Sequence, residues 1–184
     1  GKLNIVVKSD YEEATDDNVW GAYYSYNYIQ GSLMDYKDVN GKKVYNLHIS
    51  KPDNEYLEEN DGELIIAVDY GTTYNYNTTY VKEKAFMGNE HLKRILISDN
   101  YNREARCFTT PSIELRDSAF ADCPNLESIY LCYSAYGEEP REFKPLKPSQ
   151  IRPLKGVLDG SPKAVFKIFY DEYPDYLISS SWTN

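Results

Sequence analysis

The sequence predicts an α/β fold, rich in strands with short helical turns, in which the chain winds as a solenoid with an irregular N-terminal part. Three observations predict it: two segments match each other without a gap, further short runs have the apolar alternation of strands, and turn residues separate these runs. A chain of 184 residues is long enough to bury one core. We therefore expect a single domain over residues 1–184.

The first 80 residues hold three strand-like runs, KLNIVV at 2–7, KVYNLHIS at 43–50 and GELIIAV at 62–68. Each run alternates or is apolar throughout, and polar or turn residues follow it. None of them contains the Ala-Phe pair that marks the later units. We therefore expect residues 1–80 to form divergent first rungs of the coil or a capping sheet, and residues 81–184 to hold the regular repeats and a C-terminal cap.

The matching segments are VKEKAFMGNEHLKRILI at 81–97 and LRDSAFADCPNLESIYL at 115–131, with equivalent residues such as Ala85 and Ala119 lying 34 positions apart. Each unit is expected to form a short helical turn whose Ala-Phe pair points inward, then a polar bend, then a strand. Neither unit can bury its apolar face alone, so successive units should stack. The predicted repeat core comprises Val81, Ala85, Phe86, Leu92, Ile95, Ile97, Leu115, Ala119, Phe120, Leu126, Ile129 and Leu131.

A looser third copy, VLDGSPKAVFKIFY, begins at Val157-Leu158, which replace Ala-Phe, and ends in a predicted strand over residues 165–169. Three units are about the minimum for a stacked core. If they stack in register, Ile95, Ile129 and Ile168 should lie in adjacent parallel strands.

Two segments frame this third copy. Residues 132–156 contain four prolines, which remove backbone donors, and we expect a loop there between the second and third units. Residues 171–182 carry aromatic and apolar residues at mixed helical spacing, and we expect them to cap the open end of the coil. The residues of this predicted cap are Tyr173, Tyr176, Leu177 and Trp182.

The recurring pattern V-x-x-x-A-F-x-x-x-x-x-L-x-x-I-x-I, its copy with Cys123-Pro124-Asn125-Leu126, and the terminal SPKAVFKIFYDEY resemble the BspA-type leucine-rich repeat. The clear match covers residues 81–131 and continues more weakly over residues 157–182. The resemblance implies a right-handed coil with strands on one side and short helical turns on the other. It also implies a secreted or surface-displayed protein of a host-associated bacterium, with roles in adhesion and ligand binding and no enzymatic chemistry. A lipid anchor upstream of Gly1 is one means of attachment.

The charge balance disfavours nucleic acid as a partner. The chain has 20 Lys and Arg against 29 Asp and Glu, a net charge of -9, which would repel a phosphate backbone. No apolar run approaches the roughly 18 residues that a membrane-spanning helix needs. No Gly-rich phosphate loop, Gly-x-Ser-x-Gly or His-Glu-x-x-His motif appears, so we expect no catalytic residues and no cofactor.

The histidines and cysteines show no metal-ligand pattern, and we expect no metal site. His48 and His91 lie in or beside predicted strands, where surface or edge positions are expected. The three cysteines, Cys107, Cys123 and Cys132, lack Cys-x-x-Cys or Cys/His spacing. We expect Cys123 to be a buried thiol in the bend before the strand, with a Cys123–Cys132 disulfide as the alternative.

Tyrosine is abundant, with 19 residues against 6 Phe and 2 Trp. Alternation within WGAYYSYNYIQG (20–31) and YGTTYNYNTTY (70–80) places most of these rings on one side of each predicted strand. Such ladders either pack a plain sheet across its strands or form an exposed recognition surface flanked by Asn and Thr. The candidate ligand-binding residues are Trp20, Tyr24, Tyr26, Tyr28, Tyr74 and Tyr76.

The sequence therefore favours a non-catalytic binding or adhesion module, secreted or on the cell surface, that recognises a protein ligand. Two alternatives remain open. One is a carbohydrate-binding protein that uses the aromatic ladder from Trp20 to Tyr28, and the other is a structural spacer within a larger surface protein.

Overall fold

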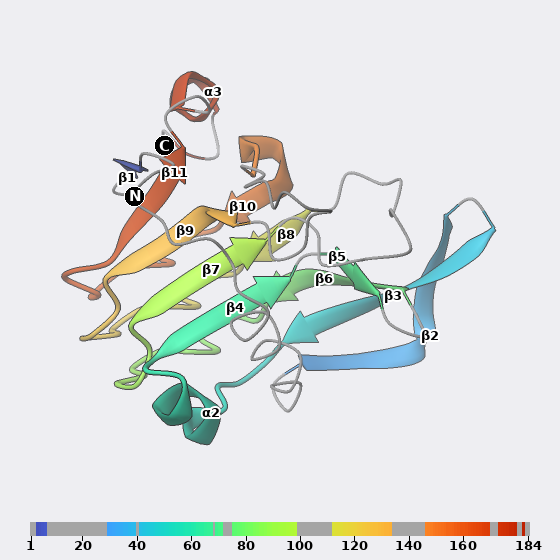
Figure 1. Cartoon of the computed structure of the whole chain (residues 1–184), viewed down its shortest axis with the longest axis horizontal. Coiled ribbons are helices and arrows are strands. Elements are labelled where there is room, and N and C mark those ends of the chain that lie inside the picture. The colour runs from blue at the N-terminus through green and yellow to red at the C-terminus, as the bar shows by residue number, and fades with distance from the viewer. Residues whose placement is uncertain are drawn as a thin grey trace.

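The protein has an α/β fold made of two largely parallel sheets and a few short helices (Figure 1). The α/β class expected from the sequence is thus confirmed. The fold comes from a computed structural model that describes residues 3–6, 29–39, 41–67, 69–71, 75–98, 112–133, 146–169, 173–179 and 182.

The first sheet has five strands, all parallel, in the order β1-β11-β9-β7-β4. The short strand β1 lies next to β11, at the opposite end of this sheet from β4 (Figure 1). The strand bounds are β1 Leu3–Val6, β4 Glu63–Ala67, β7 Arg94–Ser98, β9 Ser128–Tyr133 and β11 Val165–Phe169.

The second sheet has the order β10-β8-β6-β3-β2, with its first four strands parallel and β2 antiparallel to β3 at the edge. A further short strand, β5, pairs antiparallel with β6. The bounds are β2 Ile29–Val39, β3 Lys42–Ile49, β5 Asp69–Gly71, β6 Asn75–Val81, β8 Ile113–Leu115 and β10 Ile151–Pro153.

The chain alternates between the two sheets. From β3 to β11, apart from β5, each strand belongs to the other sheet from the strand before it. When the chain comes back to a sheet, the new strand therefore pairs with the strand that the chain last added to that sheet. The segments that match in sequence lie side by side in register, with Val81 opposite Leu115 and Ile95 opposite Ile129.

The third copy joins the same sheet in a shifted register. Its strand, β11, spans the five residues expected from the sequence, but Phe166 and not Ile168 lies opposite Ile129. Ile95, Ile129 and Ile168 therefore lie in adjacent parallel strands, as predicted, but Ile168 is offset by two residues from the position opposite Ile129. A shift of two residues keeps the same side chains on the same face of the sheet, so both Phe166 and Ile168 remain in the core.

The Ala-Phe segments form successive tight turns where the sequence predicted short helical turns. Bonds such as Met87 N to Lys84 O (3.2 Å) close these turns, and the backbone at Lys84 and Ser118 has φ of 58° and 56°. Positive φ values interrupt a right-handed helix, because L-residues rarely adopt them. The turns also bond to each other, with Phe86 N donating to Ala119 O at 2.8 Å and Phe120 N to Val157 O at 3.0 Å.

The core lies between the two sheets and these turns. All residues of the predicted repeat core belong to one buried cluster except Ala85, which is partly buried and packs against it. Phe86 and Phe120, from successive turns, lie with ring centroids 5.3 Å apart. The inward residues of β4, β7, β9 and β11 meet those of β3, β6, β8 and β10, which makes the core continuous across the units.

A buried polar position recurs in three successive bends. Asn89 donates to Asn54 Oδ1 at 2.7 Å and accepts from Leu92 N at 2.9 Å. The equivalent Cys123 directs its thiol to Phe86 O at 3.1 Å, and Ser161 Oγ donates to Phe120 O at 2.7 Å. Each side chain therefore ties its own bend to the unit before it.

The three strand-like runs predicted in the first 80 residues do not lie together in the sheets. The runs expected at 43–50 and 62–68 form β3 and β4, which join the same sheets as the later strands. Helix α2 (Asn54–Glu59) connects them, starts at an Asp53 cap and buries Leu57. The run at 2–7, expected as an early rung or part of a capping sheet, forms β1 at the edge beside the last strand, where Ile5 pairs with Ile168.

Two expectations about the C-terminal half need correction. Within the predicted loop at 132–156, the first two residues end β9, and further along, the chain forms the 3-10 helix η3 (Pro148–Gln150) and strand β10. The sheet tolerates Pro153 because β10 is an edge strand that pairs only with β8. In the predicted cap, helix α3 (Tyr173–Ile178) buries Tyr176 but leaves Leu177 48% exposed.

The buried cap residues close the core at the β11 end. Tyr176 donates its hydroxyl to Leu146 O at 2.7 Å. Trp182 meets Phe166 and Tyr176 edge to face, with centroids 4.9 Å apart in both pairs. In the part of the chain described here, no helix has the length and apolar character needed to cross a membrane.

Replacing Phe120 by Ala should lower the free energy of unfolding by about 3–5 kcal/mol, because the ring is fully buried between neighbouring turns. Urea unfolding of both proteins measures the difference. Met87→Ala is the control, since Met87 is 47% exposed and its removal should cost less than about 0.5 kcal/mol. Equal stabilities of wild type and Phe120→Ala would contradict the packing of the turns.

Candidate functional site

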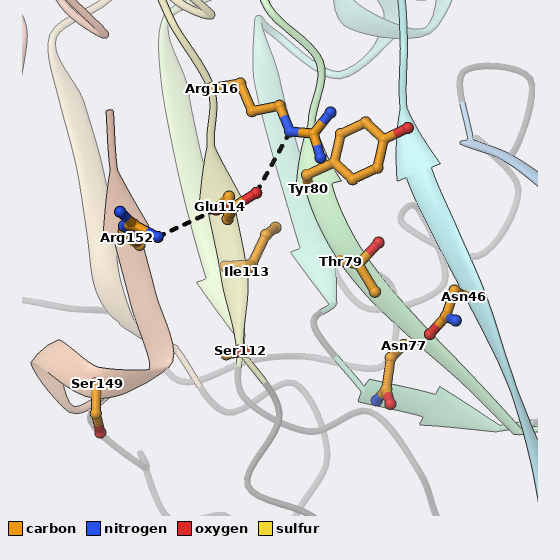
Figure 2. Close-up of a pocket in the computed structure, with 10 residues that line it drawn as sticks. All are labelled: Asn46, Asn77, Thr79, Tyr80, Ser112, Ile113, Glu114, Arg116, Ser149 and Arg152. Carbon is orange, nitrogen blue, oxygen red and sulfur yellow. Dashed lines mark hydrogen bonds and ion pairs between the residues drawn. The ribbon is translucent and has the colours of Figure 1, made fainter. Parts of the chain in front are cut away.

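A depression of about 550 Å³ lies on the outer face of the second sheet (Figure 2). It crosses four neighbouring strands, β3, β6, β8 and β10, and reaches η3. Polar and charged side chains form most of its lining: Asn46, Asn77, Thr79, Tyr80, Ser112, Ile113, Glu114, Arg116, Ser149 and Arg152.

Strand alternation and one bulge direct most of the polar lining side chains outward, while Ile113 belongs to the core. In β6, Thr78 and Val81 are fully buried, while Asn77 and Thr79 line the depression. The pairing with β3 slips by one residue after Thr78, so that His48 lies opposite Tyr80. Thr79 is the extra residue of this bulge, and the bulge brings both Thr79 and Tyr80 to the outer face.

The registers place one row of residues straight across the sheet. His48 on β3 pairs with Tyr80 on β6, Tyr80 with Glu114 on β8, and Glu114 with Arg152 on β10. Residues in register on neighbouring strands are close enough for their side chains to contact each other. The row is therefore a direct product of the parallel pairing.

Tyr80 is held by a planar group from β3 and another from the residue that follows β8. The His48 ring stacks on it with centroids 4.8 Å apart and planes inclined by only 8°. The Arg116 guanidinium carbon lies 3.5 Å from the Tyr80 ring centroid (Figure 2). Since β3 and β8 flank β6 on opposite sides, these two groups approach the ring from opposite directions.

Glu114 is shared between two arginines. Its Oε1 lies 3.4 Å from Arg116 Nε, and its Oε2 lies 3.6 Å from an Arg152 guanidinium nitrogen (Figure 2). Arg152 is the more accessible of the two arginines, with 66% of its side chain exposed against 36% for Arg116. Two guanidinium groups against one carboxylate leave the described lining with an excess of one positive charge.

Asn77 is buried without a hydrogen-bond partner. It pairs in register with Asn46 and is only 2% exposed, and neither its Oδ1 nor its Nδ2 makes a hydrogen bond to any residue in the described part of the chain. A buried amide in this state costs free energy unless another group satisfies it. Because Asn77 lines the depression, a bound molecule could supply both a donor and an acceptor to it.

Most of the aromatic residues predicted as ligand contacts fall outside the described residues, namely Trp20, Tyr24, Tyr26, Tyr28 and Tyr74. The sixth, Tyr76, lies in β6 opposite Tyr45 and Tyr70. The segment from Tyr70 to Tyr80 was predicted as one strand with its rings on one side. The structure divides it into antiparallel β5 and β6, so this prediction was wrong.

Among the lining residues, the sequence placed Tyr80 in a candidate recognition segment, the aromatic run 70–80 with its flanking Asn and Thr, but the residues on β3, β8 and β10 were not predicted, although a signal for some of them exists. Tyr80 immediately precedes the core residue Val81, and Glu114 immediately precedes the core residue Leu115. These two pairs occupy equivalent positions of the matching segments. Polar residues just before the repeated apolar positions could have been assigned to the outer face. Their partners on β3 and β10 come from segments that lack the repeat pattern.

Two further pairs of charged groups lie on the described surface away from the depression. His91 Nδ1 lies 3.2 Å from Glu58, and both side chains are substantially exposed. Lys93 lies 2.5 Å from Asp61, and this hydrogen bond and charge hold the pKa of the Asp61 carboxyl below its usual value. Within the described ranges, no three or more His, Cys, Asp and Glu side chains gather where they could hold a metal ion.

Cys123 is a free, buried thiol, so the alternative of a Cys123–Cys132 disulfide was wrong. Its amide nitrogen donates to Ser161 Oγ at 2.8 Å, and its sulfur lies against the carbonyl of Phe86. Burial raises the pKa of the Cys123 thiol, because the thiolate would lose its hydration in the core.

Comparisons of the chain with protein-family models, with curated proteins and with solved structures returned no significant match. The interpretation of the depression therefore depends on its own geometry.

Replacing Cys123 by Ala should make the free energy of unfolding depend less on pH in the alkaline range. Because the folded-state pKa is raised, the neutral thiol contributes stability that is present below the unfolded-state pKa of about 8.5 and is lost as the pH rises above it. Urea unfolding between about pH 7 and pH 10 measures the effect. Parallel pH profiles for wild type and variant would contradict the burial of the thiol, since Cys107 and Cys132 are present in both proteins.

Replacing Asn77 by Leu, a side chain of similar size, should raise the free energy of unfolding by about 1–3 kcal/mol. The change removes a buried amide that has no partner. Asn46→Leu is the matched control, because Asn46 pairs with Asn77 in register. Unlike Asn77, Asn46 is only half-buried and already makes an interaction, which the substitution would remove. A loss of stability in Asn77→Leu would show that ordered water satisfies the amide in solution.

Proposed function

We propose that this chain is a non-catalytic binding module, built as a solenoid of the BspA-type leucine-rich-repeat kind, that recognises a protein ligand through the outer face of its second sheet. We further propose that it acts outside a bacterial cell, either secreted or attached to the surface. The observation that carries the binding proposal is the row of paired side chains across β3, β6, β8 and β10 around a polar depression.

The regular alternation of the chain supports the solenoid. Consecutive strands return to alternate sheets, residues 34 positions apart pair in register, and the intervening turns bond to one another. Each unit thus contacts its neighbours through two strands and a turn, which is the arrangement that stacked repeats share. The sequence pattern that resembles the BspA-type unit coincides with these structural units.

The character of the depression supports recognition over catalysis. Its described ionisable side chains are Tyr80, Glu114, Arg116 and Arg152, and the last three neutralise each other in part through ion pairs. Acid–base chemistry needs groups whose environments separate their pKa values. Side chains that neighbours already hold in place instead lose little freedom on binding, and this favours affinity.

The test measures binding of the full chain to a panel of purified extracellular-matrix and plasma proteins by biolayer interferometry, with a glycan array in parallel. We expect at least one protein ligand whose affinity falls about tenfold or more in Arg152→Glu, because charge reversal in an interface removes a favourable pairing and adds a repulsive one. Lys155→Glu, which makes the same charge change on an exposed turn residue, should bind as wild type does.

Three outcomes would contradict the proposal. Binding of glycans alone would favour the carbohydrate-binding alternative, and binding of no ligand at all would favour a structural spacer. Protein binding that is equally strong in Arg152→Glu and wild type would place the interface elsewhere on the molecule.

A further inference from the structure

We propose that the depression on the second sheet binds an acidic peptide segment, with a side-chain carboxylate at Arg152 and Arg116 and a peptide or carboxamide group at Asn77. This inference rests on the proposed binding function and names the chemistry of the ligand. Three features of the described residues lead to it: the local charge, the unsatisfied amide and the occupied faces of Tyr80.

The local charge favours an anionic group. The chain carries a net charge of -9, yet the described lining of the depression has one positive charge in excess. Glu114 engages each arginine at 3.4–3.6 Å, and Arg152 keeps 66% of its side chain exposed. Guanidinium groups bind carboxylates through two parallel hydrogen bonds, so an incoming carboxylate can use donors of Arg152 that Glu114 does not occupy.

The unsatisfied amide of Asn77 favours a ligand group that both donates and accepts. An Asn side chain offers two N–H donors and one carbonyl acceptor in one plane. A peptide group or a carboxamide presents the complementary donor and acceptor. Because Asn77 is 2% exposed and has no hydrogen-bond partner among the described residues, satisfying it on binding recovers a cost that the free protein bears.

The occupied faces of Tyr80 argue against a sugar. Many sugar sites place a C–H face of the sugar on an open aromatic ring, but here His48 from β3 and Arg116, the residue after β8, already lie against Tyr80. No other aromatic ring is among the described lining residues. The depression therefore offers hydrogen bonds and charge, which suit a peptide, rather than a stacking platform.

The spacing of the two contact points indicates the length of the segment. Arg152 lies on β10, two strands from β6, in the same cross-strand row as Tyr80. Tyr80 is three residues along β6 from Asn77. With strands about 4.8 Å apart and about 3.3 Å per residue along a strand, the contact points are roughly 14 Å apart. An extended peptide of about four to five residues spans this distance.

The experiment titrates the ¹⁵N-labelled full chain with the peptide acetyl-Gly-Ser-Asp-Gly-Ser-Asp-Gly-Ser-amide and follows side-chain amide and arginine Nε signals by NMR. The Asn77 signal is assigned as the one missing in Asn77→Leu. The matched peptide with Asn in place of both Asp residues tests the charge, and trigalacturonate and acetate test carboxylates from a sugar and from a small acid.

We expect the Asp peptide to shift the Asn77 amide signal and to bind at least about tenfold more tightly than the Asn peptide. Affinity should fall about tenfold in Arg152→Gln and in Asn77→Leu, remain unchanged in Lys155→Gln, and weaken as salt is added. Arg152→Gln changes an exposed side chain on an edge strand, so its result does not depend on how the core tolerates substitution.

Equal binding of the Asp and Asn peptides would overturn the proposal, and so would binding of trigalacturonate or acetate at the strength of the Asp peptide. Absence of any shift at Asn77 would overturn it as well. If these peptides fail while a panel protein binds in an Arg152-dependent manner, the binding function stands and only the acidic-peptide chemistry fails. If no protein on the panel binds and the peptide also fails, both proposals fall.

Discussion

Parallel backbone pairing between segments that follow one another along the chain is the constraint on which the rest of the described structure depends. It acts in three places: in the first sheet, in the second sheet and between the turns, where Phe86 N bonds to Ala119 O. Because the backbone of each segment pairs with the next, equivalent residues must return to equivalent positions. One apolar residue per position then builds a continuous core, as with Ile95 against Ile129.

The same constraint explains the polar residues inside the bends. A bend cannot use sheet hydrogen bonds, so its backbone groups need other partners when they are buried. Asn89, Cys123 and Ser161 occupy this position in successive units, and each contacts the unit before it. Three different side chains serve here because the shared requirement is a short side chain that can donate a hydrogen bond.

Strand alternation separates the residues that fill the core from those that lie on the outer face of the second sheet. Along β6 and β8, inward residues such as Val81 and Leu115 fill the core, while outward residues such as Tyr80 and Glu114 form the cross-strand row. Outer residues can therefore vary without repacking the core. Asn77 departs from this division, because it faces the depression and is nevertheless buried without a partner. This is the kind of local conflict expected where a protein binds something else.

The sequence by itself determined the α/β class, the positions of β3, β4, β7, β9 and β11, and the burial of the Ala-Phe segments, because these follow from local periodicity and an ungapped internal match. Tertiary structure decided what depends on partners distant in sequence. It moved β1 beside β11, ordered β10 within a proline-rich segment, and set Phe166 against Ile129. It also assembled the candidate site, since His48, Tyr80, Glu114 and Arg152 come from four separate strands. Only the register of those strands, which the side-chain pattern of any one segment does not specify, brings them into one row.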